Sequence, residues 1–187
     1  MDCVKIKKKR VFITNGNLYL DNNNINQIQD IKKLKQFTNL KGLFLENNKL
    51  TQIEGLDHLV NLKKLHLEGN SITEISGLDS LVNLEELELG HNQISIIDNL
   101  NHLQNLLALV LNDNRLTTIG GLKNLINLKS LDLSNNQLED LDGIENLKNL
   151  EYLNLSNNNI KETKILAKLT NLQTLKLNGN PIEKSNA

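Results

Sequence analysis

Side chains able to do chemistry are sparse in this sequence, and one group has a suggestive arrangement. His66 falls among four acidic residues, Glu46, Glu68, Glu86 and Glu88. One histidine with two carboxylates is a ligand set that a divalent metal ion accepts. No second histidine occupies a position that converges on the same point. We therefore expect no metal ion and no cofactor.

Motifs of the familiar catalytic classes are absent from the sequence. It contains no glycine-rich phosphate loop, no HExxH pair, and no serine or cysteine with a base at a diagnostic spacing. The one cysteine, Cys3, cannot form an internal disulfide. We expect a protein that is not an enzyme.

Composition and net charge further narrow the class of protein. Of 187 residues, 40 are leucine and 32 are asparagine, and the net charge is −1. Such a bias indicates a repeated unit, whereas ordinary domains spread their apolar positions over several residue types. A near-neutral chain lacks the overall basic charge expected of a nucleic-acid binder. No apolar run approaches the roughly 18 residues that span a bilayer, so we expect neither nucleic acid nor membrane as partner.

The basic stretch from Lys5 to Arg10 bears on where in the cell the protein is expected to lie. Only Val11, Phe12 and Ile13 follow it before polar residues resume, which is too short for the apolar region of a signal peptide. We expect a cytoplasmic protein, with a nuclear location as the alternative and secretion disfavoured. The basic side chains are expected to be solvated and to protect a sheet edge.

A repeat of 22 residues runs through the chain without a slip. The pair Leu43 and Leu45 recurs at this interval six more times, and an earlier copy, Leu18 and Leu20, lies 25 residues upstream. The leucines at alternate positions indicate a short strand, and the apolar residues that follow at every third position indicate a tight or 3₁₀-like return path. The predicted strands lie near 18–20, 43–45, 65–67, 87–89, 109–111, 131–133, 153–155 and 175–177.

The repeated unit, LxxLxLxxN followed by spaced aliphatic residues, resembles the leucine-rich repeat. It is most similar to the 22-residue class found in the nuclear regulatory subunit of protein phosphatase 1 and in bacterial internalins. The resemblance implies an α/β solenoid: a right-handed horseshoe with an eight-stranded parallel sheet on its concave side and turns or 3₁₀ helices on its convex side. We expect a basic segment and β-hairpin cap at 1–17, repeats at 18–182, and a tail at 183–187.

One asparagine per repeat is expected to be structural. A carboxamide can both donate and accept, so it can satisfy the backbone where the chain leaves each strand. A glycine or asparagine shared by five repeats, at 55, 77, 99, 121 and 143, indicates a positive φ angle. The predicted asparagine ladder is Asn23, Asn48, Asn70, Asn92, Asn114, Asn136, Asn158 and Asn180.

The two ends of the repeat array depart from the regular pattern. Asn15-Gly16 is the preferred dipeptide of a type I′ hairpin, which predicts a strand at 11–14 antiparallel to the first repeat strand. The alternative is a degenerate half-repeat in which Phe12 fills the core. Towards the other end, 162–169 is a candidate short helix. The last strand exposes Leu175 and Leu177, so self-association through this edge is a further expectation.

The solvent side of the predicted sheet carries the candidate binding residues. Its three columns of residues hold six acids against two lysines, and three of the chain's five aromatics lie on it. Exposed aromatics on a rigid face are typical of interface hot spots. The alternatives are that Tyr19 and Phe44 stack only on each other and that the acids only solvate the face. The predicted partner-binding residues are Tyr19, Phe44, Glu46, His66, Glu68, Glu86, Glu88, Val110, Asp132 and Tyr152.

These features predict a protein-interaction scaffold whose concave face binds a protein with a basic, partly apolar surface. The phosphatase-regulator resemblance offers a regulatory subunit of an intracellular phosphatase or another enzyme as an alternative. The internalin resemblance offers a surface adhesin, although internalins carry a helical N-terminal cap, and the 17 residues before the first repeat are few and basic. A scaffold that assembles through the C-terminal edge is a third alternative.

Overall fold

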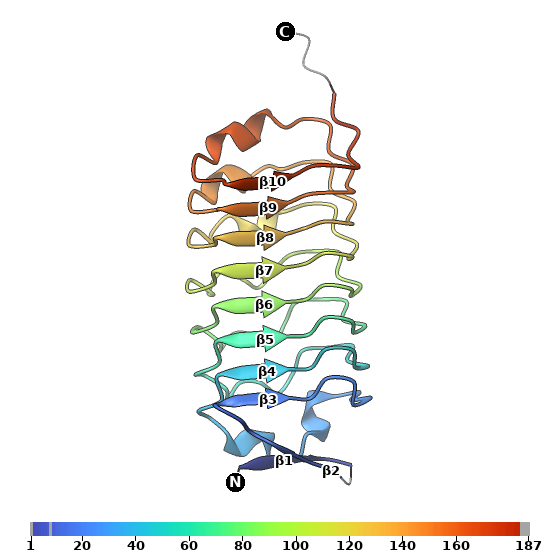
Figure 1. Ribbon diagram of the computed structural model, residues 1–187, viewed down its shortest axis with the longest axis vertical. Helices are drawn as coiled ribbons and strands as arrows, with labels where there is room; N and C mark the ends of the chain where they lie inside the picture. Colours follow the sequence, from blue (N-terminus) through green and yellow to red (C-terminus); the bar gives the residue numbers. More distant parts are fainter. Residues whose placement is uncertain (1, 8, 184–187) are drawn as a thin grey trace.

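The computed structural model describes residues 2–7 and 9–183 and forms a solenoid whose strands stack along one axis (Figure 1). Strands β3 to β10 form an eight-stranded parallel sheet in sequence order, and β1 and β2 form a separate antiparallel pair. The bounds are β1 Cys3–Ile6, β2 Lys9–Phe12, β3 Asn17–Tyr19, β4 Gly42–Phe44, β5 Lys64–His66, β6 Glu86–Glu88, β7 Ala108–Val110, β8 Ser130–Asp132, β9 Tyr152–Asn154 and β10 Thr174–Lys176.

Each strand is centred on the first leucine of its pair. Leu43 lies opposite Leu18 in β3 and Leu65 in β5, and the same register continues through the sheet. The strands thus begin and end one residue earlier than predicted. The second leucine, such as Leu45, is fully buried after the strand, and its N–H donates to the His66 carbonyl. Pairing therefore continues beyond the regular strand while the chain begins to turn.

The return path is built from tight turns and short 3₁₀ helices, which confirms the prediction. Leu59 N–H donates to the Leu56 carbonyl, and Leu62 N–H donates to the Leu59 carbonyl. This spacing puts every third residue inside, so the aliphatic residues of the return path and the strand leucines form one core. The 3₁₀ helices are η1 Ile28–Asp30, η2 Leu34–Gln36, η3 Gly120–Leu122, η4 Ile144–Asn146 and η5 Lys164–Lys168.

The 3₁₀ helix η5 lies inside the segment 162–169, where the sequence suggested a short helix. At its centre Leu166 is buried, while Ile165, which replaces the glycine or asparagine of other repeats, is partly buried against the core. The larger side chain lies within η5, which at 5 residues is longer than η3 and η4 with 3 residues each.

The ladder asparagines hold the turns through buried hydrogen bonds. Asn70 donates from Nδ2 to the carbonyls of Leu67 in its own repeat and Leu45 in the preceding one. Its Oδ1 accepts from the N–H of Leu50, also in the preceding repeat. Asn92 and Asn114 repeat this pattern. Each of these carboxamides therefore joins two successive turns of the chain. Asn23 departs from the predicted ladder, because no repeat precedes it, and among the described residues its carboxamide donates only to the Asp21 carbonyl in its own turn.

The shared glycine or asparagine of the return path is less uniform than predicted. Gly77 has a φ of +66° and Asn99 one of +58°. Gly121, which was expected to match them, is not among the residues with a positive φ, because the chain enters η3 at this point. A Cβ on Gly121 would nevertheless overlap the Ile97 carbonyl, so close approach is the reason for glycine there.

The N-terminal segment has the predicted turn at Asn15-Gly16 but differs from both predictions in the residues that precede it. Asn15 and Gly16 have φ angles of +53° and +78°, and Thr14 exchanges backbone hydrogen bonds with Asn17, as a two-residue hairpin turn requires. The strand before the turn, β2, pairs with β1 and not along β3. The side chain of Phe12 is 47% exposed and does not fill the core. Instead, Val4 and Ile6 of β1 are buried at this end of the solenoid.

At the other end, β10 pairs with β9 on one side. Leu175 at its centre is 40% exposed, whereas the equivalent leucines of the inner strands are fully buried. In the residues described, no helix is long and apolar enough to cross a membrane.

The ladder yields a stability prediction. Replacing Asn114 with Ala removes the acceptor of the Ile94 N–H and the donor to the Leu89 carbonyl. Unsatisfied buried backbone groups cost about 1–3 kcal/mol each, so we expect a loss of about 2–4 kcal/mol in the free energy of unfolding by urea. The matched control is Asn159→Ala at an exposed position, expected to change it by about 0.5 kcal/mol or less. Equal losses in the two variants would contradict the structural role.

Candidate functional site

The candidate site lies on what we call the sheet face, the side of the eight-stranded sheet that its buried leucines do not occupy. Side chains alternate along each strand, so the residues on either side of the central leucine point to solvent. Tyr19, Phe44 and His66 are therefore direct neighbours on β3, β4 and β5. Glu88 follows in the same row on β6, and Val110 on β7.

Three rings pack in series across this row. The Tyr19 and Phe44 rings stack with centroids 4.5 Å apart and planes 17° from parallel. The His66 ring then meets Phe44 edge-on at 4.6 Å. Gly42 leaves room for this arrangement, because a Cβ there would lie 2.8 Å from Cε2 of Phe44. The Tyr19 side is open to solvent, with half of that residue's surface exposed.

His66 is enclosed by three carboxylates. Its Nδ1 lies 3.3 Å from Glu46 Oε1 and 3.2 Å from Glu88 Oε2, and its Nε2 lies 3.0 Å from Glu86 Oε1. Only 12% of the His66 side chain is exposed. The other oxygen of Glu86 pairs with Lys64 Nζ at 2.6 Å. The structure therefore brings Glu46, His66, Glu86 and Glu88 into one cluster, which we call the His66 cluster.

The two carboxyls of β6 have opposite electrostatic environments. Burial raises the pKa of Glu88 above its ordinary value, and the nearby Glu86, Glu46 and Glu68 raise it further against the opposing effect of His66. Burial also acts to raise the pKa of Glu86, but the hydrogen bond and charge of Lys64, together with His66, outweigh it and lower that pKa. The side chains of Glu86 and Glu88 point to the same face of the sheet. The direction of each pKa shift therefore depends on the charged groups that each carboxyl contacts.

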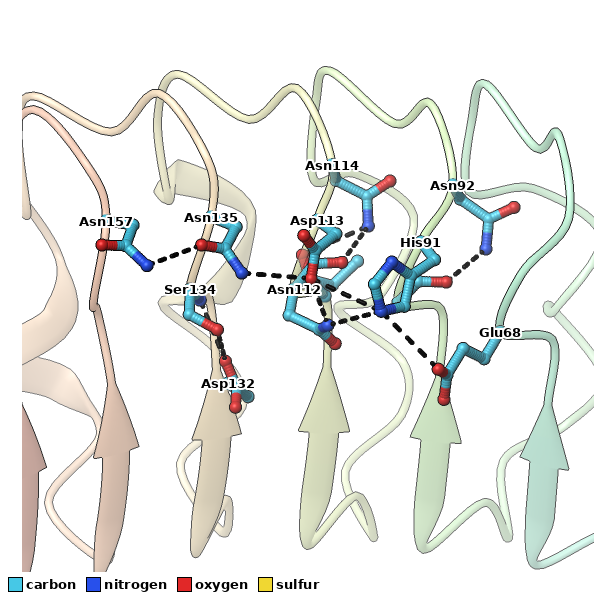
Figure 2. A network of polar contacts seen from close by, with 12 residues as sticks. Glu68, His91, Asn92, Asn112, Asp113, Asn114, Asp132, Ser134, Asn135 and Asn157 are labelled. Atoms are coloured by element: carbon cyan, nitrogen blue, oxygen red, sulfur yellow. Dashed lines mark hydrogen bonds and ion pairs between the residues drawn. The ribbon is translucent and has the colours of Figure 1, made fainter. Parts of the chain in front are cut away.

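Glu68 lies outside the His66 cluster and contacts His91. Its carboxylate lies 3.8 Å from Nε2 of His91, which is also 3.5 Å from Asp113. This pair opens a row of polar side chains along the turns that follow the strands (Figure 2). Farther along the row, Asn135 donates to Asp113, and Asn157 donates to Asn135.

Sequence reasoning missed this row of polar turn residues. His91 and Asp113 adopt φ angles of +51° and +54°, and the equivalent position in other repeats is Asn or Gly. The preference of Asn, Asp and Gly for positive φ at a fixed interval is the signal that could have found it.

The remaining predicted residues lie apart from the His66 cluster. Asp132 accepts from the Ser134 hydroxyl and from the Asn154 carboxamide on the next strand. Tyr152 is on β9, where the ammonium group of Lys176 lies 5.3 Å from the centre of its ring. The sheet face therefore divides into an aromatic and acidic half over β3 to β6 and a more neutral half beyond Val110.

A groove lies away from the predicted partner-binding residues of the sheet face. It has a volume of about 640 Å³, runs beside the amino ends of the later strands and is lined mainly by polar side chains, including Asn105, Asn127 and Asn149. None of the predicted partner-binding residues lines it. The candidate site is thus an open surface, as expected for contact with a macromolecule and not for enclosure of a small molecule.

Each inner turn of the described chain contributes one strand, one buried asparagine and a tight return path, which is the construction of a solenoid repeat protein. The chain belongs to the leucine-rich repeat family, and this confirms the resemblance. The family described as Leucine Rich repeats (2 copies) matches residues 60–102, 104–146 and 148–187, and the family described as Leucine rich repeat matches 16–72. Domains of this kind generally mediate protein–protein interactions and are typically non-enzymatic.

Two solved structures from Listeria monocytogenes are similar. Internalin C2 is 32% identical with a TM-score of 0.85, over 91% of this chain and 74% of the internalin chain. The internalin inlF is 27% identical with a TM-score of 0.63, over 91% of this chain and 63% of the other. A comparison with curated protein sequences finds no match.

The opposite pKa shifts give a paired prediction. Above the raised pKa of Glu88 its charge costs stability, and this cost disappears as the pH falls towards the ordinary carboxyl pKa. Glu88→Gln should therefore resist urea better than the wild type at pH 7.5, and the gain should disappear near pH 4.3, roughly the ordinary value. Glu86→Gln should be less stable at pH 7.5, and its deficit should persist near pH 4.3, because the pKa of Glu86 is lowered.

Urea midpoints of the two variants and the wild type, measured in buffer free of divalent cations, provide the check. The two variants are matched, since each replaces one carboxyl of β6 by an amide of the same shape. Shifts of the same sign at pH 7.5 would contradict the assignment of environments.

Proposed function

We propose that this chain is a protein-interaction domain that binds a protein partner on the sheet face, with Tyr19 and Phe44 as apolar anchors. The observation that carries the proposal is the stack of these two rings, Tyr19 half exposed and Phe44 partly buried, beside the acidic residues of the His66 cluster. A rigid aromatic pair loses little conformational entropy on binding, so its contact area contributes efficiently to affinity.

The charges beside the stack define the kind of partner. Glu46 and Glu88 are partly exposed, with 33% and 25% of their side chains accessible, and Glu68 is more open at 40%. Lys64 neutralises Glu86, which leaves an excess of negative charge on this half of the face. A partner surface carrying lysine or arginine around an apolar centre is complementary, whereas a phosphate backbone would be repelled.

Support for a purely structural role of the stack is weaker. A ring pair that served only the sheet would gain most by being covered, yet Tyr19 remains half exposed. Asp132 and Tyr152, whose polar or ring groups contact neighbours within the chain, are better explained by such internal roles. The proposed contact area is therefore centred on β3 to β6, with Val110 at its margin.

The internalin likeness favours a second candidate, a surface adhesin of the internalin type, in which the same face would bind a protein of another cell. Against it, the N-terminal strand pair β1 and β2 takes the place where the resemblance implies a helical cap. Protease treatment of intact cells from the native source separates the two: loss of the chain supports the adhesin, and protection supports an intracellular partner.

The sheet-face proposal is tested by affinity capture. We expect Phe44→Ala combined with Glu88→Ala to weaken capture of the partner from native extract by about thirtyfold or more, the effect of losing a hot-spot contact of about 2 kcal/mol. Captured chains are identified and quantified by mass spectrometry, and circular dichroism verifies folding.

The matched control is Val60→Ala combined with Glu54→Ala, which removes one exposed apolar and one exposed acidic side chain away from the sheet. Capture should survive in this control. Capture that is unchanged in the sheet-face variant, or lost equally in both, would refute the proposal.

A further inference from the structure

We infer that Glu46, His66 and Glu88 form a binding site for a divalent transition-metal ion, with Nδ1 of His66 and one oxygen of each carboxylate as ligands. The inference concerns a metal and does not depend on the proposed protein partner. It differs from the expectation drawn from the sequence, which required a second histidine.

The ligand atoms already converge. One ligand atom from each of the three side chains lies within 4.8 Å of the other two. Nδ1 of His66 is 3.3 Å from Glu46 Oε1 and 3.2 Å from Glu88 Oε2. Ligands bound tetrahedrally to zinc at about 2.0–2.2 Å are separated by roughly 3.3–3.6 Å, so these two distances are close to those around a bound zinc ion.

Hydrogen-bond counting is consistent with a positive charge beside Nδ1, which either a second ring proton or a metal ion would supply. His66 presents two ring nitrogens to three carboxylates, and a neutral imidazole carries one N–H. When Nε2 donates that hydrogen to Glu86, the lone pair of Nδ1 is left beside one oxygen of Glu46 and one oxygen of Glu88, at 3.3 and 3.2 Å. Three electron-pair donors this close together are stabilised by a bound positive ion.

Glu86 completes the arrangement as a positioning residue. A metal-binding histidine usually donates its other N–H to a carboxylate, which orients the ring and increases its basicity. Glu86 holds Nε2 at 3.0 Å and is itself held by Lys64. The Phe44 ring packs against the same imidazole in a T-shaped contact, so the imidazole is restrained before any ion arrives.

The ligand types indicate which ions fit. Imidazole nitrogen suits zinc and other first-row transition metals, whereas magnesium and calcium prefer all-oxygen sites. Three protein ligands leave at least one coordination position for water or another group. The partly exposed carboxylates of Glu46 and Glu88 place that position towards the sheet face.

The test titrates the full chain, freed of metal by a chelator, with zinc alone in calorimetry and native mass spectrometry. We expect one zinc ion per chain. The Glu46→Gln and Glu88→Gln double variant should lose affinity tenfold or more, and Glu86→Gln should weaken it by about 10–100-fold while one ion still binds at saturation. If the double variant does not fold, Glu46→Gln alone serves, since it leaves Glu88, the less exposed of the two carboxylates, in place.

Two controls locate the ion. His91→Asn removes a histidine that also lies between two carboxylates, Glu68 and Asp113, but is 53% exposed; Cys3→Ser removes the single thiol. Both should bind zinc as the wild type does. Equal zinc affinity in the wild type and the double variant, or loss of binding in either control, would overturn the inference. No partner protein is present, so the outcome is independent of the capture experiment.

Discussion

The structure depends on one repeated interaction, the hydrogen bonding of a buried carboxamide to the backbone of two successive turns. A chain that turns sharply after three strand residues leaves N–H and C=O groups without ladder partners. Asn70, Asn92 and their equivalents satisfy those groups in their own turn and in the one before it. No turn is complete alone, so stability grows along the stack, as in other solenoids.

This dependence explains where variation is tolerated. The leucine and asparagine positions are set by the core and the turn, which leaves the residues on the sheet face free of packing demands. Tyr19, Phe44 and the acidic residues occupy such free positions. These residues gather on the first four strands of the sheet, and the surface beyond Val110 is more neutral. The fold does not require this distribution, so it is a feature of this particular protein.

The ends show how far the periodic reasoning extends. The Asn15-Gly16 turn followed from local chemistry, since both residues adopt positive φ readily. The partner of the preceding strand did not, because β1 lies in a segment with no repeat pattern, and its pairing with β2 depends on burying Val4 and Ile6 against the first turn. The φ angle at Gly121 was also not determined by the local sequence. A glycine suits either a left-handed turn or, as here, a close approach to the Ile97 carbonyl.

The repeated leucine motif and its spacing were sufficient for the number of parallel strands, their register, the leucine core and the surface on which Tyr19, Phe44 and Glu88 lie. Side-chain alternation and a constant step leave one consistent stacking. Whether neighbouring side chains meet was decided only in three dimensions. The enclosure of His66 by three carboxylates, and the opposite pKa shifts of Glu86 and Glu88, depend on rotamers and burial, because these determine contacts of about 3 Å that spacing along the chain does not specify.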